Sequence, residues 1–163
     1  MKCKARFALE QGSLDEQTPW PPYPAETLWA ELIGPRSARL LNSPFYAKGV
    51  NYLDEVRVKD ADLPPGMKPE EANPYFFEFE SVLKRSGHGT VRAILKSEDH
   101  RQIAEEAVSA ITQAGCTWEG ADGGLLSIDI PPGVNAGAVM ATLALAYARG
   151  AIYVDVGYVP PST

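Results

Sequence analysis

Hydrophobic and polar residues alternate along much of the first half of the chain, and this alternation predicts short β-strands. It is clearest over residues 2–10, where Cys3, Ala5, Phe7 and Leu9 fall on one face. Further strands are predicted at residues 27–33, 37–41, 55–59, 75–84 and 90–96. Several short strands in succession are typical of a small barrel or a curled sheet.

Two proline-rich segments interrupt these strands. Residues 11–25 hold four prolines and predict an extended connection, because proline suits neither a helix interior nor a central strand. Residues 60–74 hold four more prolines and predict a long loop without regular structure. Glycines flank His88 in a predicted turn, so residues 75–96 are expected to form a hairpin.

The hydrophobic period changes after residue 96. Ser97 is suited to cap a helix, and apolar residues follow it at helical spacing as far as Gly115. The remaining predicted elements are a strand at 125–130, a helix that Asn135 caps and that ends at Arg149-Gly150, and a strand at 151–159.

These elements predict the α+β class, with two parts. Residues 1–96 form a β-rich part, either a small barrel or a curled sheet. Residues 97–163 form a two-layer βαβαβ part of the ferredoxin-like kind, and its sheet includes the strand at 90–96.

Composition narrows the function classes. The chain has 163 residues, of which 45% are hydrophobic and 22% charged, as in an ordinary globular protein. Its net charge is −6, and residues 91–163 carry −4 of it. An acidic chain lacks the lysine and arginine surplus that phosphate binding needs, so a nucleic-acid partner is not expected.

A cytoplasmic location is expected. No apolar stretch follows the basic residues at the start of the chain, which argues against a secretory signal. The apolar run from Val134 to Ala148 is too short to span a bilayer, so no membrane association is expected. Cys3 and Cys116 lie far apart in the sequence and are expected to be reduced thiols.

Several motifs together carry a family resemblance. They are WPP at 20–22, ETLWA at 26–30, NSPFYAKGV at 42–50, DEV at 54–56, RSGHGTVR at 85–92 and IDIPP at 128–132. In this order they resemble a family of small bacterial proteins catalogued only as a domain of unknown function. The resemblance implies a bacterial source and no particular reaction, and residues 60–74 look like an insertion into the family pattern.

The first candidate site lies around the predicted turn at residues 85–89. Arg85, Ser86, His88 and Arg92 could bind an anion there, with His88 also able to act as a general base. The structural alternative is that glycines serve the turn geometry while His88 bonds backbone at the barrel rim.

The second candidate site is the connection from residue 42 to residue 54. It mixes aromatic and polar side chains in a way that suits partner recognition. The residues concerned are Tyr46, Lys48, Asn51, Tyr52 and Asp54. The structural alternative is that the aromatic residues plug the end of the barrel.

Motifs for other chemistry are missing from the sequence. Two histidines and two cysteines, all distant from one another, match no metal-ligand spacing. There is no Gly-x-Ser-x-Gly elbow, and the glycines at 120, 123 and 124 precede a predicted strand rather than opening a helix as in a phosphate loop. No catalytic residue, metal or cofactor is therefore expected.

Two functions are consistent with these observations. One is a non-catalytic immunity protein that binds and neutralises a cognate toxin or effector, by charge complementarity. The alternative is a small-ligand-binding protein or an enzyme that uses Arg85, His88 and Arg92 as an anion site in a cleft between the two parts. The sequence leaves the oligomeric state open.

Overall fold

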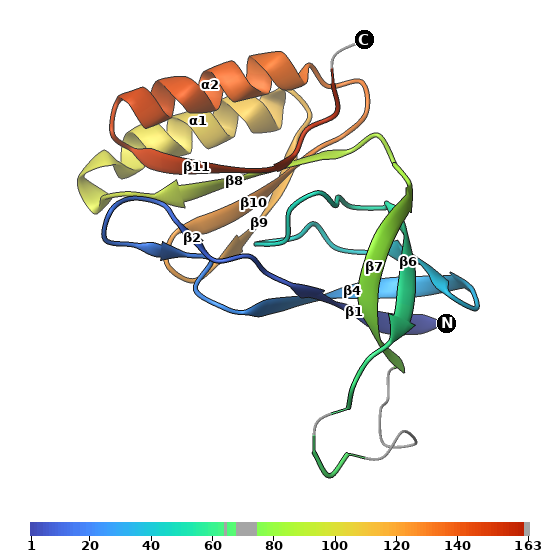
Figure 1. Cartoon of the computed structure of the whole chain (residues 1–163). Helices are drawn as coiled ribbons and strands as arrows, with labels where there is room; N and C mark the ends of the chain where they lie inside the picture. Colours follow the sequence, from blue (N-terminus) through green and yellow to red (C-terminus); the bar gives the residue numbers. More distant parts are fainter. Residues whose placement is uncertain (64, 68–74, 162–163) are drawn as a thin grey trace.

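A computed structural model describes residues 1–63, 65–67 and 75–161 (Figure 1). Most of the proline-rich loop predicted at 60–74 lies outside these residues. In the described part, Asp60 still belongs to a strand, β6 (Glu55–Asp60).

The N-terminal part is a closed five-stranded barrel. This confirms the predicted β-rich part and shows that, of the small barrel and the curled sheet, it has the first form. Cys3, Ala5 and Phe7 alternate with exposed or partly exposed neighbours and point into its core, on the face that the sequence pattern predicts. The parallel pairing of the first and last strands closes the barrel. The strands are β1 (Lys2–Ala8), β4 (Ala25–Gly34), β5 (Ser37–Leu40), β6 and β7 (Tyr75–Lys84).

The predicted hairpin at residues 75–96 is wrong. β7 stays in the barrel between β6 and β1, whereas β8 (Gly89–Leu95) starts a second sheet. Six of the seven residues of β8 are buried, so this strand needs neighbours on both sides and cover on both faces. Gly87, with φ of 90°, lies where the chain passes from one sheet to the other.

The second sheet has four antiparallel strands in the order β11-β8-β10-β9. Of these, β9 was not predicted, because its five residues are all exposed and carry no apolar alternation. The strands beside β8 are β9 (Thr117–Ala121), β10 (Leu125–Ile130) and β11 (Ile152–Tyr158).

Two helices, α1 (Arg101–Gln113) and α2 (Ala136–Ala148), cover one face of this sheet (Figure 1). The predicted caps are confirmed: Ser97 Oγ accepts the Asp99 N–H at the start of a short 3₁₀ helix (Glu98–His100), and Asn135 Oδ1 accepts the Ala138 N–H. Neither α1 nor α2 is long and apolar enough to cross a membrane.

Residues 11–25 form a stiff connection with a small hairpin, β2 (Gly12–Ser13) and β3 (Pro19–Trp20), rather than only an extended segment. Figure 1 shows this hairpin beside the second sheet, on the side away from the helices.

The segment that joins β5 to β6, residues 41–54, packs against the same side of the sheet. Glu26 on β4 fixes it to the barrel, because its carboxylate accepts the backbone N–H groups of Phe45, Tyr46 and Ala47 at 2.6, 2.9 and 2.8 Å. We call this segment the seam segment, since it lies between the barrel and the sheet.

Replacing Glu26 should loosen the seam segment. A Glu26→Gln change keeps the size but removes the charge that strengthens three hydrogen bonds, and should lower the free energy of unfolding by about 1–3 kcal/mol. Urea denaturation measures this, with Glu31→Gln on the exposed face of the same strand as the control. Equal stability of the two variants would contradict the anchoring role.

Candidate functional site

The face of the second sheet that the helices leave uncovered is polar and buried. Thr90, Arg92, Ser127, Asp129 and Asp155 lie on β8, β10 and β11, and each is at most 8% exposed. Buried polar groups are costly unless they are hydrogen-bonded. The partners come from the seam segment, for example where Ser127 Oγ donates to the Pro44 carbonyl at 2.8 Å.

Arg92 is the centre of this face and is fully buried. Its Nε and Nη2 donate to Oδ2 of Asp155 at 3.1 and 2.7 Å. Its Nη1 and Nη2 donate to the carbonyls of Ala47 and Tyr46, both at 2.9 Å. A Cβ at Gly157 would collide with Nη1 of Arg92, whose guanidinium is held by these hydrogen bonds, so this position has room only for glycine. Arg92 therefore joins the sheet to the seam segment and has no exposed surface with which to bind a free anion.

Asp155 receives more than one partner. Its Oδ1 lies 3.2 Å from Nζ of Lys48, and its Oδ2 also accepts the indole N–H of Trp20 at 3.3 Å. Burial alone would raise the pKa of Asp155, but the charges of Arg92 and Lys48 outweigh it and hold the pKa below its ordinary value. Arg92 and Lys48 thus share one carboxylate, so these three side chains together carry a net charge of +1.

Asp54 is a second fully buried carboxylate and ties the turn after β7 to the seam segment. It accepts the backbone N–H groups of Asn51 and Ser86 at 3.0 and 2.8 Å, and Nη1 of Arg85 at 3.1 Å. The hydroxyl of Ser86 donates to the Tyr52 carbonyl at 2.7 Å. These bonds join the two predicted candidate sites to each other.

The side chain of His88 bonds to the carboxylate of Asp129 and not to the arginines near it in the sequence. Its Nδ1 lies 2.9 and 3.0 Å from the carboxylate oxygens of Asp129, and its ring meets Tyr52 edge-on at 5.3 Å. Burial raises the pKa of Asp129, and the hydrogen bond and charge of His88 offset this only in part. Nearby, the Thr90 hydroxyl donates to Oδ1 of Asn51 at 2.7 Å.

The nine residues that the sequence singled out therefore meet in one region, but most of them bind one another. Arg92, Asn51 and Asp54 are fully buried. The acids that complete the network, Asp129 and Asp155, were missed. Each interrupts an apolar strand, and an acid in such a setting signals a buried charge that needs a partner.

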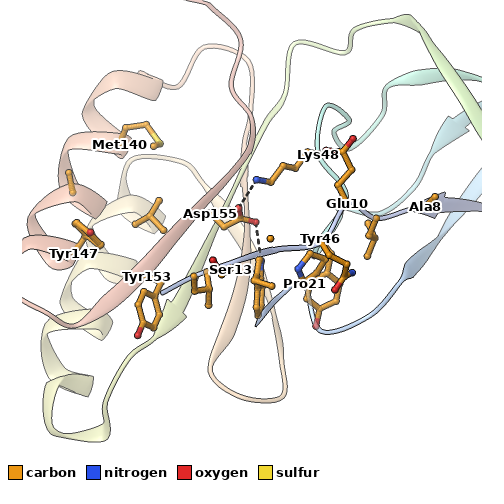
Figure 2. Close-up of a pocket in the computed structure, with 17 residues that line it drawn as sticks. Ala8, Glu10, Ser13, Pro21, Tyr46, Lys48, Met140, Tyr147, Tyr153 and Asp155 are labelled. Carbon is orange, nitrogen blue, oxygen red and sulfur yellow. Dashed lines mark hydrogen bonds and ion pairs between the residues drawn. The ribbon is translucent and has the colours of Figure 1, made fainter. Parts of the chain in front are cut away.

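A cleft of about 810 Å³ opens between the N-terminal part and the sheet, beside β11 and α2 (Figure 2). Its walls carry the aromatic side chains of Trp20, Tyr46, Tyr147 and Tyr153, with Lys48 and Asp155 as the ion pair on one side. Trp20 and Tyr46 lie 5.3 Å apart, centroid to centroid. Of the predicted site residues, Tyr46 and Lys48 line this cleft, whereas Arg85 and His88 do not.

A hydrogen bond fixes the loop between β2 and β3 against the sheet near the cleft. The Tyr153 hydroxyl donates to Oδ2 of Asp15 at 2.5 Å. This bond, together with bonds from Gln17 and Thr18, lowers the pKa of Asp15 to about 2. The Tyr153–Asp15 bond thus attaches the loop between β2 and β3 to β11.

The structure also bears on metal binding and on the reactivity of the two cysteine thiols. In the described parts of the chain, no three His, Cys, Asp or Glu residues gather closely enough to hold a metal ion. Cys3 and Cys116 are both free and buried, and burial raises the pKa of each thiol. Neither is therefore disposed to form the thiolate that a nucleophile needs.

Removing the buried cation should destabilise the fold strongly. An Arg92→Met change leaves Asp155 buried with only the exposed Lys48, and should lower the free energy of unfolding by about 3–5 kcal/mol. The control is Arg39→Met, whose partly exposed pair with Glu55 should contribute about 1 kcal/mol or less. Urea denaturation compares them, and similar losses in the two variants would contradict the role of Arg92.

The Asp155 carboxylate should make stability depend on pH. Because its pKa is lower in the folded chain than its ordinary value of 3.8, its contribution is complete above that value and is lost as the pH falls through the folded pKa. The stability difference between wild type and Asp155→Asn should thus be largest near neutral pH and shrink below about pH 4. A difference that stays constant down to acid pH, in denaturant titrations, would contradict this assignment.

Comparison with known proteins gives a family and a fold. A family model described as "Domain of unknown function (DUF4265)" matches residues 26–153. The structure is similar to that of a hypothetical protein from Neisseria gonorrhoeae, with a TM-score of 0.68 and 14% sequence identity, over 99% of this chain and 96% of that chain. Such low identity shows a shared fold alone. No curated protein sequence matches the chain.

The family match covers most of the chain, including the seam segment and all of β8, β9 and β10. It confirms the resemblance to a family catalogued only as a domain of unknown function. This chain belongs to the DUF4265 family.

Proposed function

We propose that this protein binds a small, planar anion in the cleft beside β11. The observation that carries the proposal is the position of Lys48, whose side chain is 65% exposed on the wall of a cleft of about 810 Å³. Clefts of roughly 300–1,000 Å³ with aromatic walls and a few polar groups are the usual sites for small molecules.

One exposed cation, Lys48, favours an anion, in a cleft lining that also carries the carboxylates of Asp155 and Glu10. Arg92 and Lys48 share the single carboxylate of Asp155, and Arg92 is buried behind it. Lys48 is therefore the cation that a carboxylate or phosphate group could reach. This proposal moves the anion site predicted from the sequence away from Arg85 and His88 to Lys48.

The aromatic side chains favour a flat ligand. Tyr46 stands on one wall and Tyr153 on another (Figure 2), and Trp20 contacts Tyr46. A ring could pack between these walls while its acidic group reaches Lys48. Glu10 and Gln11 also line the cleft and could bind polar substituents. The proposal is one of binding, and it assigns no reaction to the protein.

We also propose that the C-terminal part has a ferredoxin-like fold and that the protein is located in the cytoplasm. The order β8-α1-β9-β10-α2-β11, with antiparallel strands arranged β11-β8-β10-β9, supports the first. In such a two-layer unit the helices cover only one face of the sheet. Here the seam segment packs against the other face. Two free, buried cysteines are consistent with the second.

A partner-binding role of the immunity type is the second candidate. It is favoured by β9, all five residues of which are exposed and which carries Trp118, at 46% exposure, next to Glu119. A surface of this kind would suit a basic toxin or effector, as the uneven charge of the chain predicts.

The ligand proposal predicts a dependence on Lys48. In a thermal-shift screen of aromatic carboxylates and nucleoside monophosphates, at least one compound should raise the melting temperature of the wild type. Its affinity for Lys48→Gln should fall by about tenfold or more, because a charge-assisted contact is lost.

Lys59→Gln, on an exposed position of β6, is the matched control and should bind like the wild type. If no compound stabilises the wild type, or if Lys48→Gln binds as well as Lys59→Gln, the ligand proposal is wrong.

A further inference from the structure

We propose that the outer edge of β9 is a docking site for a basic, extended segment of a partner protein, which adds to the sheet as a fifth strand. This inference rests on the second candidate function and says where the partner binds and by what chemistry. It involves the edge of the sheet opposite to the cleft, since β11 and β9 are the two outer strands.

The first observation is an open sheet edge. β9 pairs with β10 on one side, and within the described residues no strand lies on its other side. All five of its residues are exposed. An edge strand presents unpaired backbone N–H and C=O groups that can bind another strand, and proteins usually cover or blunt such edges.

The second observation is an apolar groove that reaches this edge. A cavity of about 520 Å³ lies under α1 on the helix side of the sheet, and its largely apolar lining extends from β9 and β10 inward to β8 and to Ile152 on β11. Trp118 forms part of its wall; it is paired with Ile128 and so lies on the helix side of the sheet. Ala104, Val108 and Leu126 also line the groove. Alternate side chains of an added strand would point into this groove.

The third observation is the charge around the edge. Glu119, the middle residue of β9, is paired with Ser127 and lies on the other side of the sheet from Trp118. Asp122 is exposed in the turn that follows, and Glu105 lines the groove from α1. The one basic residue in the groove lining, Arg101, is already paired with Glu98 and lies 4.0 Å from Glu105. The edge is therefore acidic.

This charge selects the occupant. If a second copy of the chain paired antiparallel through β9, a pairing centred on the strand would place Glu119 opposite Glu119, and like charges directly opposite destabilise a pair of strands. A strand with lysine or arginine at that position gains an attractive pair instead. The occupant we infer alternates apolar residues, which enter the groove, with basic residues, which face Glu119.

The test uses synthetic nine-residue peptides labelled with a fluorophore, in which lysine alternates with valine. Fluorescence anisotropy measures their binding to the wild-type chain. Two further peptides test how binding occurs. One has glutamate in place of lysine and tests the charge. The other keeps the side chains of the lysine peptide but has N-methylated backbone nitrogens, which block strand pairing.

Two pairs of variants locate the site. Glu119→Lys and Trp118→Ala change β9, while Glu31→Lys and Trp29→Ala make the same changes on β4, an inner strand of the closed barrel with no free edge. The lysine peptide should bind the wild type with saturation. Its affinity should fall by about tenfold for each β9 variant and stay unchanged for the β4 variants.

Each other outcome overturns the inference in a recognisable way. Equal binding of the N-methylated or glutamate peptide would exclude basic strand addition. Unchanged binding to Glu119→Lys and Trp118→Ala would show that the site is wrong while a basic-partner role stands. If no peptide binds the wild type, or if sedimentation shows a dimer that Trp118→Ala abolishes, the docking of a basic partner strand is overturned and, in the latter case, a second copy is the occupant.

Discussion

The structure depends on one buried positive charge. Arg92 projects from β8, one of the two inner strands of the sheet, toward the seam segment and has no solvent-exposed surface. A charge in that position requires a carboxylate and hydrogen-bond acceptors in fixed places. Asp155 on the neighbouring strand and the carbonyls of Tyr46 and Ala47 supply them. The same contact therefore sets the position of the seam segment, requires glycine at 157 and places Lys48 at the cleft.

Around this contact the two parts of the chain behave as one unit. Glu26 fixes the seam segment to the barrel, and Arg92, Thr90 and Ser127 fix it to the sheet. Asp54 fastens the turn after β7 to the same segment. The cleft beside β11 is a by-product of this arrangement, because the sheet, the seam segment and the β2–β3 hairpin meet there without filling the space. At the opposite edge of the sheet, no strand of the described residues pairs with the outer side of β9.

Local pattern predicted the local features well. The alternation in β1 and the caps at Ser97 and Asn135 are properties of a few adjacent residues, and the structure has them where the sequence predicts. Strand pairing was harder, because β8 finds its partners β10 and β11 far along the chain, and nothing near the turn at 85–89 shows that β7 has a different sheet. β9 was not predicted, because an exposed edge strand does not need the alternation of apolar and polar residues by which strands are recognised.

The candidate site likewise combines features that the local sequence predicts with features that depend on the fold. Residue type and loop position were enough to select the two groups of polar residues that meet at the seam. They could not tell which of them would face solvent, because that depends on Asp129 and Asp155, which arrive from strands more than thirty residues away in sequence. Only the three-dimensional arrangement shows that Arg92 is buried in internal hydrogen bonds, whereas Lys48 pairs with Asp155 and keeps an exposed side chain.

A double-mutant cycle between Arg92 and Asp155 tests this account most directly. Unfolding free energies are measured for Arg92→Met, Asp155→Leu and the two together. If the buried pair organises the seam, the double variant loses much less than the sum of the two single losses, with a coupling of about 2–3 kcal/mol, because neither charge is left alone. Additive losses would show that the two side chains act independently, and would contradict the account.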